Sequence, residues 1–230
     1  MSKMMRKVMM GAAAVAAILP AAAYAGNPEG KIQVKLLATG VLPNGEVRAA
    51  SGPAAGLLTG SNLKANDNVV PTLAVEYFVK PNVSVETICC FTSHHVTATG
   101  ALAGAGILDN VMILPATVTL KYHLPLGPVK PYVGVGPSAF FFLKNRPAAD
   151  LIGASSGAVA TSSMKAQVGV ALQAGVDVPV TNTGISLTLD AKRYFMRPTA
   201  RFYDAAGAEL LAARVKLDPW VVSGGVAYRF

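Results

Sequence analysis

Eight ionisable residues carry the polar chemistry that the sequence places inside its predicted fold. They are four acids and four bases, and each stands opposite the aliphatic side chains of its own segment: Lys35, Glu76, Glu86, Lys121, Asp177, Asp190, Lys192 and Arg229. A buried charge without a partner is costly, so equal numbers of acids and bases suit a narrow interior of low dielectric constant. Two interpretations stay open: a structural ion-pair network that plugs this interior, or a gated polar constriction beneath an apolar vestibule.

Two adjacent cysteines and two adjacent histidines form a second group of reactive side chains. Cys and His suit zinc, and Ser93 with His95 is a combination found in hydrolases. In an extended strand Cys90 and His94 share one face whereas Cys89 and His95 share the other, so the four do not converge on one metal ion. There is no G-x-S-x-G motif, and no nearby acid on that face orients His95. We therefore expect no enzyme, no metal site and no cofactor.

The elements that position these residues are clearest at the end of the chain, in residues 215–230. Along this stretch one face is apolar, with aromatics towards both ends: Trp220, Val222, Gly224, Val226, Tyr228 and Phe230. The other face is small or polar. This pattern is typical of a transmembrane β-strand with a lipid face and a lumen face. The alternative is the closing strand of a soluble sandwich or barrel.

Period-two alternation and turn signals predict eight such strands. Their ranges are 31–39, 68–78, 83–95, 111–124, 129–143, 164–178, 184–196 and 215–230. Pro137 predicts a bulge or local break in the fifth strand, because proline cannot donate to a ladder.

The connections between these strands alternate strictly between long and short. The long ones are rich in turn formers or small residues and are expected to be loops: residues 41–67, 96–110, 144–163 and 197–214. Outer-membrane barrels combine an even number of strands with short periplasmic turns and longer extracellular loops. The sequence therefore predicts an all-β fold, an eight-stranded antiparallel transmembrane β-barrel with both termini in the periplasm and the eight ionisable residues in its lumen.

The first 25 residues are typical of a cleaved secretory signal peptide. A basic start, an apolar run and an A-x-A site follow one another in residues 1–7, 8–19 and 23–25. A membrane anchor is the alternative, but the run is short and Pro20 interrupts it. Cleavage leaves residues 26–230 as one outer-membrane barrel domain. Of the net charge of +8, three positive charges lie in residues 1–7, so the mature chain carries +5.

Two groups of surface residues indicate the surroundings of the barrel. Aromatic residues on the apolar faces are candidates for the membrane interfaces: Tyr77, Tyr122, Trp220, Tyr228 and Phe230. Basic residues in the loops and rims either pair with lipopolysaccharide phosphates or form a solvated rim: Lys144, Arg146, Lys165, Arg193, Arg197, Arg201 and Arg214. We expect outer-membrane lipid and lipopolysaccharide as partners, and no nucleic acid, because no basic–aromatic motif is present.

Several stretches together resemble the outer membrane protein W (OmpW) family of Gram-negative bacteria. They run in the family's order through residues 69–73, 85–86, 114–118, 121–123, 130–136, 172–177 and 217–230. The chain departs from the family at Ile32, where Trp is usual, and at Cys89 and Cys90, where an Ala-rich pair is common. The resemblance implies an outer-membrane location and a narrow, partly hydrophobic interior associated with passive entry of small hydrophobic molecules.

Two functions stay open. In the first, the apolar or small loops 98–108 and 148–160 form a vestibule for a hydrophobic solute. Because eight strands leave no wide aqueous channel, that solute leaves laterally into the membrane. In the second, the barrel is a plugged structural or adhesive anchor whose long extracellular loops bind a partner.

Overall fold

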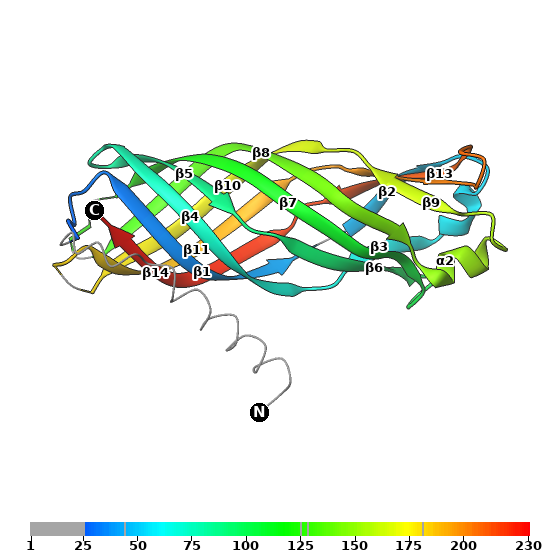
Figure 1. Cartoon of the computed structure of the whole chain (residues 1–230), viewed down its shortest axis with the longest axis horizontal. Coiled ribbons are helices and arrows are strands. Elements are labelled where there is room, and N and C mark those ends of the chain that lie inside the picture. Colours follow the sequence, from blue (N-terminus) through cyan, green and yellow to red (C-terminus); the bar gives the residue numbers. More distant parts are fainter. Residues whose placement is uncertain (1–25, 44, 125, 128, 181) are drawn as a thin grey trace, which may run out of the picture.

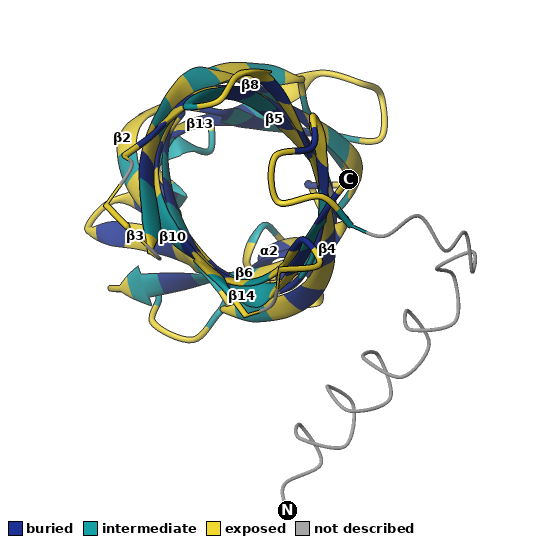
Figure 2. Cartoon of the chain, turned by 90° about the vertical axis from the view of Figure 1, so that its left-hand side faces the viewer, coloured by how far each residue is buried: buried dark blue, intermediate teal, exposed yellow. Residues whose placement is uncertain are grey.

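The structure, a computed structural model, describes residues 26–230 apart from residues 44, 125, 128 and 181. The predicted signal peptide, residues 1–25, lies outside the described residues and stays a prediction. Figures 1 and 2 show a closed barrel from the side and along its axis. Within the described part of the chain, no helix is long and apolar enough to cross a membrane.

Eight antiparallel strands, one of them divided in two, form the barrel wall and confirm the predicted barrel. In chain order they are β1 (Ile32–Leu42), β4 (Asn68–Lys80), β5 (Val83–Cys89) continued by β6 (Thr92–Gly100), β7 (Gly106–His123), β8 (Lys130–Pro147), β10 (Gln167–Pro179), β11 (Ile185–Phe195) and β14 (Trp220–Arg229). β1 pairs with both β14 and β4, and the β7–β8 pairing completes the ring. We call the end with the short turns and the C-terminus the terminal end, and the opposite end the loop end.

The long connections are not loops, and this part of the prediction is wrong. They contain β2 (Gly45–Ser51), a 3-10 turn η1 (Ala55–Leu58), β3 (Ser61–Ala65), a short helix α2 (Ala149–Ala154), β9 (Thr161–Met164), β12 (Thr199–Tyr203) and β13 (Glu209–Leu217). A second sheet, in the order β2-β13-β12-β9, continues the wall at the loop end (Figure 1). Its inner face packs into an apolar cluster that includes Leu63, Ile107, Leu151, Phe202 and Leu211.

Several strand boundaries also differ from the prediction. The predicted strand 83–95 is divided at Cys90 and Phe91, and the predicted loop 96–110 is largely the hairpin of β6 and β7. Residues 215–217 belong to β13, and β14 begins only after Pro219.

Pro137 does not produce the predicted bulge. β8 is continuous, and the register with β10 is unchanged at the pair Pro137↔Val170. The break is confined to the ladder with β7, which is interrupted between the pairs Thr117↔Ser138 and Leu120↔Val135. A proline can stay in a strand where its missing N–H falls in such an interruption.

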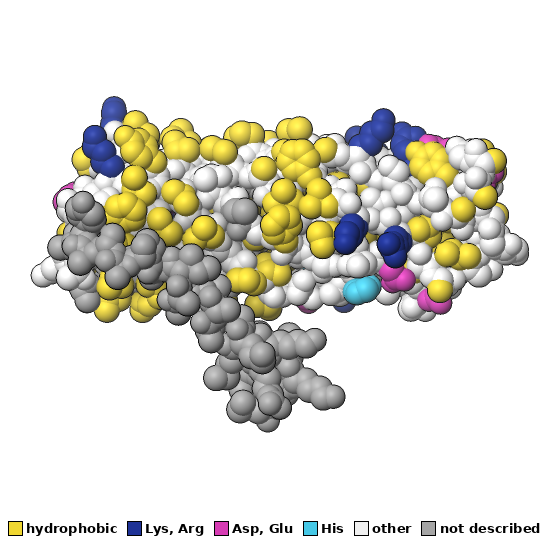
Figure 3. Space-filling model, viewed as in Figure 1, with side chains coloured by type: hydrophobic (Ala, Val, Ile, Leu, Met, Phe, Trp, Pro, Cys, Tyr) yellow, Lys and Arg dark blue, Asp and Glu magenta, His cyan; other side chains and the backbone are white. Residues whose placement is uncertain are grey.

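Inward and outward residues alternate along the wall strands (Figure 2). In β1, Gln33, Lys35 and Leu37 are buried, while Val34 and Leu36 lie towards the outer surface. Large hydrophobic side chains are exposed along the wall strands. On the face shown in Figure 3 they form a belt, and Lys and Arg gather at its two ends. This arrangement is typical of a barrel surrounded by lipid.

The five aromatic candidates lie on this outer surface. Tyr77, Tyr122 and Phe230 are exposed, and the Tyr228 ring lies 5.8 Å from the Phe230 ring, all at the terminal end. Trp220 is exposed at the opposite end of β14.

Candidate functional site

A compact ion-pair network fills the lumen on the terminal side. Glu86 lies at its centre, where its carboxylate is 3.0 Å from Lys35 Nζ, 2.9 Å from Lys121 Nζ and 3.1 Å from Lys192 Nζ. Glu76 Oε2 is 2.8 Å from Lys35 Nζ and 2.9 Å from Lys121 Nζ. All five side chains are at most 3% exposed. We call this network and the polar groups bonded to it the plug.

Acids and uncharged polar groups complete the plug. Lys192 Nζ donates to Asp190 Oδ1 at 2.7 Å. The Gln173 amide donates to Glu86 Oε1 at 2.9 Å and to Asp190 Oδ2 at 2.6 Å, while its oxygen accepts from the Thr119 hydroxyl. The Tyr132 hydroxyl donates to Asp190, and Lys121 Nζ lies 3.7 Å from the centre of the Tyr132 ring. These partners satisfy the buried charges that would otherwise oppose folding.

Towards the terminal end the polar side chains in the lumen make fewer and longer contacts. Asp177 Oδ2 is 3.7 Å from Lys35 Nζ and accepts from the Gln33 amide at 3.2 Å. Arg229 lies apart: it donates to the Gly30 carbonyl, and its guanidinium lies 3.5 Å from the centre of the Phe78 ring. It forms no ion pair with any residue that the structure describes. Of the eight predicted lumen residues, seven are therefore brought together and Arg229 is not.

The sequence reasoning missed the uncharged members of the plug. Tyr132 in β8 is only 2% exposed, and Gln173 in β10 is only 3% exposed. His123, whose Nε2 is 2.8 Å from Glu76 Oε1, also joins the plug, together with Ser84, which donates to Glu76. Their signal was the same inward periodicity that identified the charged residues.

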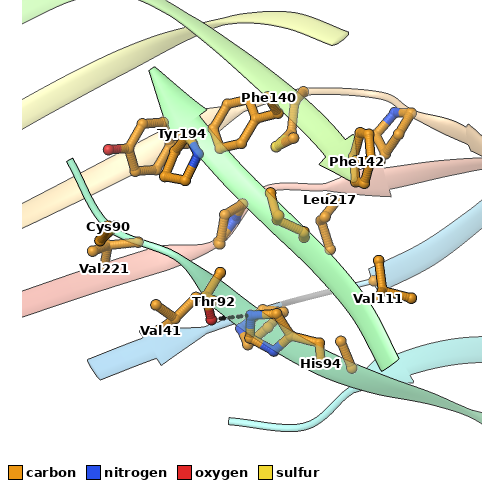
Figure 4. Close-up of a pocket in the computed structure, with 18 of the residues that line it drawn as sticks. Val41, Cys90, Thr92, His94, Val111, Phe140, Phe142, Tyr194, Leu217 and Val221 are labelled. Carbon is orange, nitrogen blue, oxygen red and sulfur yellow. Dashed lines mark hydrogen bonds between the residues drawn. The ribbon is translucent and has the colours of Figure 1, made fainter. Parts of the chain in front are cut away.

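On the loop side of the plug lies an apolar cavity of about 110 Å³ (Figure 4). Aliphatic and aromatic side chains dominate its lining, among them Val41, Val111, Phe140, Phe142, Leu217 and Val221. The Phe140 and Tyr194 rings meet edge to face, with centres 5.2 Å apart. An apolar cavity of ~150 Å³ in another protein stays dry and binds benzene. This cavity is therefore of the order needed for a small apolar molecule.

The apolar cluster of the loop end bounds the cavity on its far side. Leu63, Leu108 and Val111 belong both to that cluster and to the cavity lining. The predicted vestibule segments 98–108 and 148–160 contribute buried residues to the same cluster. The cavity thus lies between a polar floor and an apolar cap.

The barrel wall beside the cavity contains an interruption of the backbone ladders at the junction of β5 and β6. The β4–β5 ladder ends at Leu73↔Cys89, and pairing on this side resumes only at Ala65↔Val96, between β3 and β6. The ladder with β7 is interrupted between the pairs Ile88↔Thr117 and Thr92↔Ile113. β5 and β6 are therefore separated at residues 90–91, where the wall changes from the β4–β5 pairing to the β3–β6 pairing. We call this region the wall break.

Side chains bridge the wall break. The Asn68 amide donates to the Ser93 carbonyl at 2.9 Å, and Asn66 Oδ1 accepts from the His95 backbone N–H at 2.6 Å. His94 Nδ1 is 2.8 Å from the Asn66 carbonyl oxygen, which only accepts, so Nδ1 is the donor. In the neutral ring, His94 Nε2 then accepts from the Thr92 hydroxyl, at 2.8 Å (Figure 4). Hydrogen bonds of individual side chains, together with the backbone bond from the Asn66 N–H to the His95 carbonyl, take the place of a continuous ladder here.

The hydrolase-like residues do not form a relay. Ser93 Oγ donates to Asn110 Oδ1 at 2.8 Å rather than to a histidine. The expectation that no acid lies near His95 is wrong, because His95 Nδ1 is 3.4 Å from Asp109 Oδ1 across the β6–β7 hairpin. Both side chains of this pair are more than half exposed.

Comparison with known proteins identifies the kind of barrel. Residues 28–230 match the OmpW family. The chain is 31% identical over 176 residues to the uncharacterized outer-membrane protein y4mB of Sinorhizobium fredii, covering 74% of this chain and 70% of that protein. It is 28% identical over 173 residues to the dibenzothiophene metabolism operon protein PahQ of Pseudomonas aeruginosa, covering 74% and 76%.

A solved structure shows the same fold. The outer membrane protein OprG from Pseudomonas aeruginosa superposes with a TM-score of 0.75 at 20% identity, covering 89% of this chain and 98% of that one. A barrel of eight wall strands, an apolar outer belt and a family match over nearly all of the described residues agree with one another. The chain therefore belongs to the OmpW family of outer-membrane proteins.

Proposed function

We propose that this barrel lets small hydrophobic molecules enter passively through the outer membrane, by way of the apolar cavity and then laterally through the wall break. In this proposal the loop end faces outside, both termini face the periplasm, and the partners are outer-membrane lipid, lipopolysaccharide and the solute. The observation that carries it is the apolar cavity, which ends on a charged floor and adjoins the wall break.

The plug supports a lateral exit. A molecule continuing along the axis would have to separate ion pairs such as Lys121–Glu86, whose atoms are 2.9 Å apart and fully desolvated. Exposing such charges to an apolar molecule is strongly unfavourable. At the wall break the exit requires instead the loss of a few single hydrogen bonds, such as that from Asn68 to Ser93.

The chemistry of the cavity supports an uncharged, apolar solute. Its wall offers aromatic faces and edges at Phe140, Phe142 and Tyr194, and its polar pairs, Thr39–Ser223 and Thr92–His94, bond to each other. The relative PahQ is named for a dibenzothiophene metabolism operon. Dibenzothiophene is an uncharged aromatic compound, the class that this lining would accept.

Uptake measurements test the proposal against the adhesive alternative. Cells with the protein should take up naphthalene several times faster than cells without it, and glycerol at the same rate. Equal rates for naphthalene in both strains, together with lost binding of cells to an external surface, would instead establish the plugged anchor.

The wall break makes a specific prediction. Asn68→Ala removes the hydrogen bond to the Ser93 carbonyl. A net hydrogen bond contributes ~0.5–1.5 kcal/mol, so its loss should raise the population of molecules with an open wall break by roughly 2- to 10-fold. We expect naphthalene uptake to rise by a similar factor.

Asn62→Ala is the matched control for this prediction. Asn62 also bonds a backbone group, the Val47 N–H at 3.1 Å, but it lies in β3 at the loop end, away from the break. Equal uptake by the Asn68→Ala and Asn62→Ala variants would place the exit elsewhere.

A further inference from the structure

A second cavity lies on the outside of the barrel, where the apolar belt ends towards the loop end. It is a groove of about 560 Å³ between the start of β10, the end of β11 and the strands β12 and β13. Val168 and Phe195, both exposed outer side chains, form its apolar part, while Thr199, Arg197 and Arg214 form its polar part. The groove therefore crosses the boundary between the apolar belt and the polar rim.

Three cations lie at or beside this groove. Arg197 and Arg214 line it and are exposed. Lys165 is also exposed. It follows Met164, which pairs with Ala200 in an antiparallel ladder, so Lys165 is next to Thr199 in register. Thr199 in turn pairs with Arg214. None of these three cations forms an ion pair with another described residue.

The acids near the groove are already engaged. Asp218 is buried, accepts from the Met196 backbone N–H and lies 3.4 Å from Lys216 Nζ. Glu209 accepts from Arg201 at 2.5 Å, and this hydrogen bond raises the pKa of Arg201. The groove consequently has a surplus of positive charge directly beside an apolar surface.

We propose that this groove binds the phosphorylated, acylated headgroup region of a lipopolysaccharide molecule in the outer leaflet. Arginine forms bidentate hydrogen bonds with phosphate oxygens, so Arg197 and Arg214 would hold a phosphate between them. Val168 and Phe195 would contact the acyl chain that leaves the headgroup. A free phosphate ion would use only the polar half of the groove. The proposal rests on the orientation proposed above, with the loop end outside.

The chain contains a built-in reporter for this site. Trp220 is its only tryptophan, and it pairs with Arg193, whose guanidinium lies 5.1 Å from the centre of the Trp220 ring. Arg193 stands two residues before Phe195, at the edge of the groove. A lipid phosphate bound there is expected to attract the Arg193 guanidinium away from the Trp220 ring, and this movement should change the Trp220 fluorescence.

The test uses the purified full-length mature protein in dodecyl maltoside micelles, titrated with lipid A. Arg197→Gln/Arg214→Gln is expected to weaken binding by about tenfold or more, since each basic residue near an anionic lipid surface contributes about 1 kcal/mol. Arg197→Lys/Arg214→Lys keeps the charge but loses the bidentate geometry, so an intermediate affinity is expected. Lys64→Gln/Lys80→Gln removes the same charge from exposed positions outside the groove and should bind like the wild type.

Other ligands decide what the groove recognises. Dephosphorylated lipid A lacks the phosphate and inorganic phosphate lacks the acyl chain, so each should bind at least about tenfold more weakly than lipid A. Phosphatidylglycerol has both parts, but its phosphodiester carries less negative charge than a phosphomonoester of lipid A, so it should also bind more weakly than lipid A, by a smaller factor. Equal loss of affinity in the Lys64/Lys80 variant, or equal binding of dephosphorylated lipid A, would overturn the proposal. Heat-modifiable gel migration verifies that each variant is folded. Naphthalene uptake should be unchanged in the Arg197/Arg214 variant, so failure of the lipid site and failure of the transport proposal are separate results.

Discussion

Lys121→Met is expected to destabilise the barrel by about 3–5 kcal/mol, the cost of breaking a buried ion pair by removing one partner. Lys121 Nζ lies 2.9 Å from both Glu76 and Glu86, and its side chain is 0% exposed. Methionine has a similar length and fills the same space, so the loss is electrostatic rather than a cavity. We would measure it as the urea midpoint of unfolding in lipid vesicles, followed by heat-modifiable gel migration.

The charge count of the plug supplies the controls. The network contains four acids, Glu76, Glu86, Asp177 and Asp190, and three lysines, Lys35, Lys121 and Lys192. Removing Lys121 leaves four acids against two lysines, and adding Glu86→Gln restores the original difference of one. The double variant is therefore expected to be more stable than Lys121→Met alone, a coupling that only residues in one network show. Lys64→Met, on the exposed face of β3, should have almost no effect.

The wall of the barrel could be predicted because lipid requires apolar side chains on the outer face of each strand, whereas the part of the narrow lumen towards the terminal end contains paired polar side chains on the inner face. Gln33 and Lys35 alternate with Val34 and Leu36, and this contrast survives in nearly every wall strand. Outside the apolar belt the outward face is free to be polar or apolar. In β12, Thr199–Tyr203, the outward Arg201 and the inward Phe202 alternate in polarity over too few residues to predict a strand, so the sequence predicts a loop there.

The wall break could not be predicted from the sequence for a different reason. Cys90, Thr92 and His94 are all buried, so the inward alternation continues through the break without a signal. What changes there is the neighbouring strand, because β5 pairs with β4 whereas β6 pairs with β3. The contact of His95 with Asp109 was missed for the same reason, because it depends on a hairpin that the sequence presented as a loop.

Val221→Trp is expected to reduce naphthalene uptake to the level of cells without the protein. Val221 lines the apolar cavity from β14, a strand whose ladders with β1 and β11 run through this position. An indole in place of the isopropyl group would occupy the space of about 110 Å³ that the solute needs. Overpacking a core typically costs about 1–3 kcal/mol, so the variant should still fold and migrate as a heat-modifiable barrel.

The neighbouring residue provides the matched control. Val222→Trp makes the same chemical change one position along β14, but Val222 is 47% exposed on the outer surface. Tryptophan is well accommodated at a membrane interface, so this variant should transport naphthalene like the wild type. If both variants transport equally well, the solute does not pass through the lumen and the proposed route is wrong. If only Val221→Trp is inactive while Asn68→Ala is faster than the wild type, cavity and wall break act in series, and the charged plug forces the solute to leave sideways.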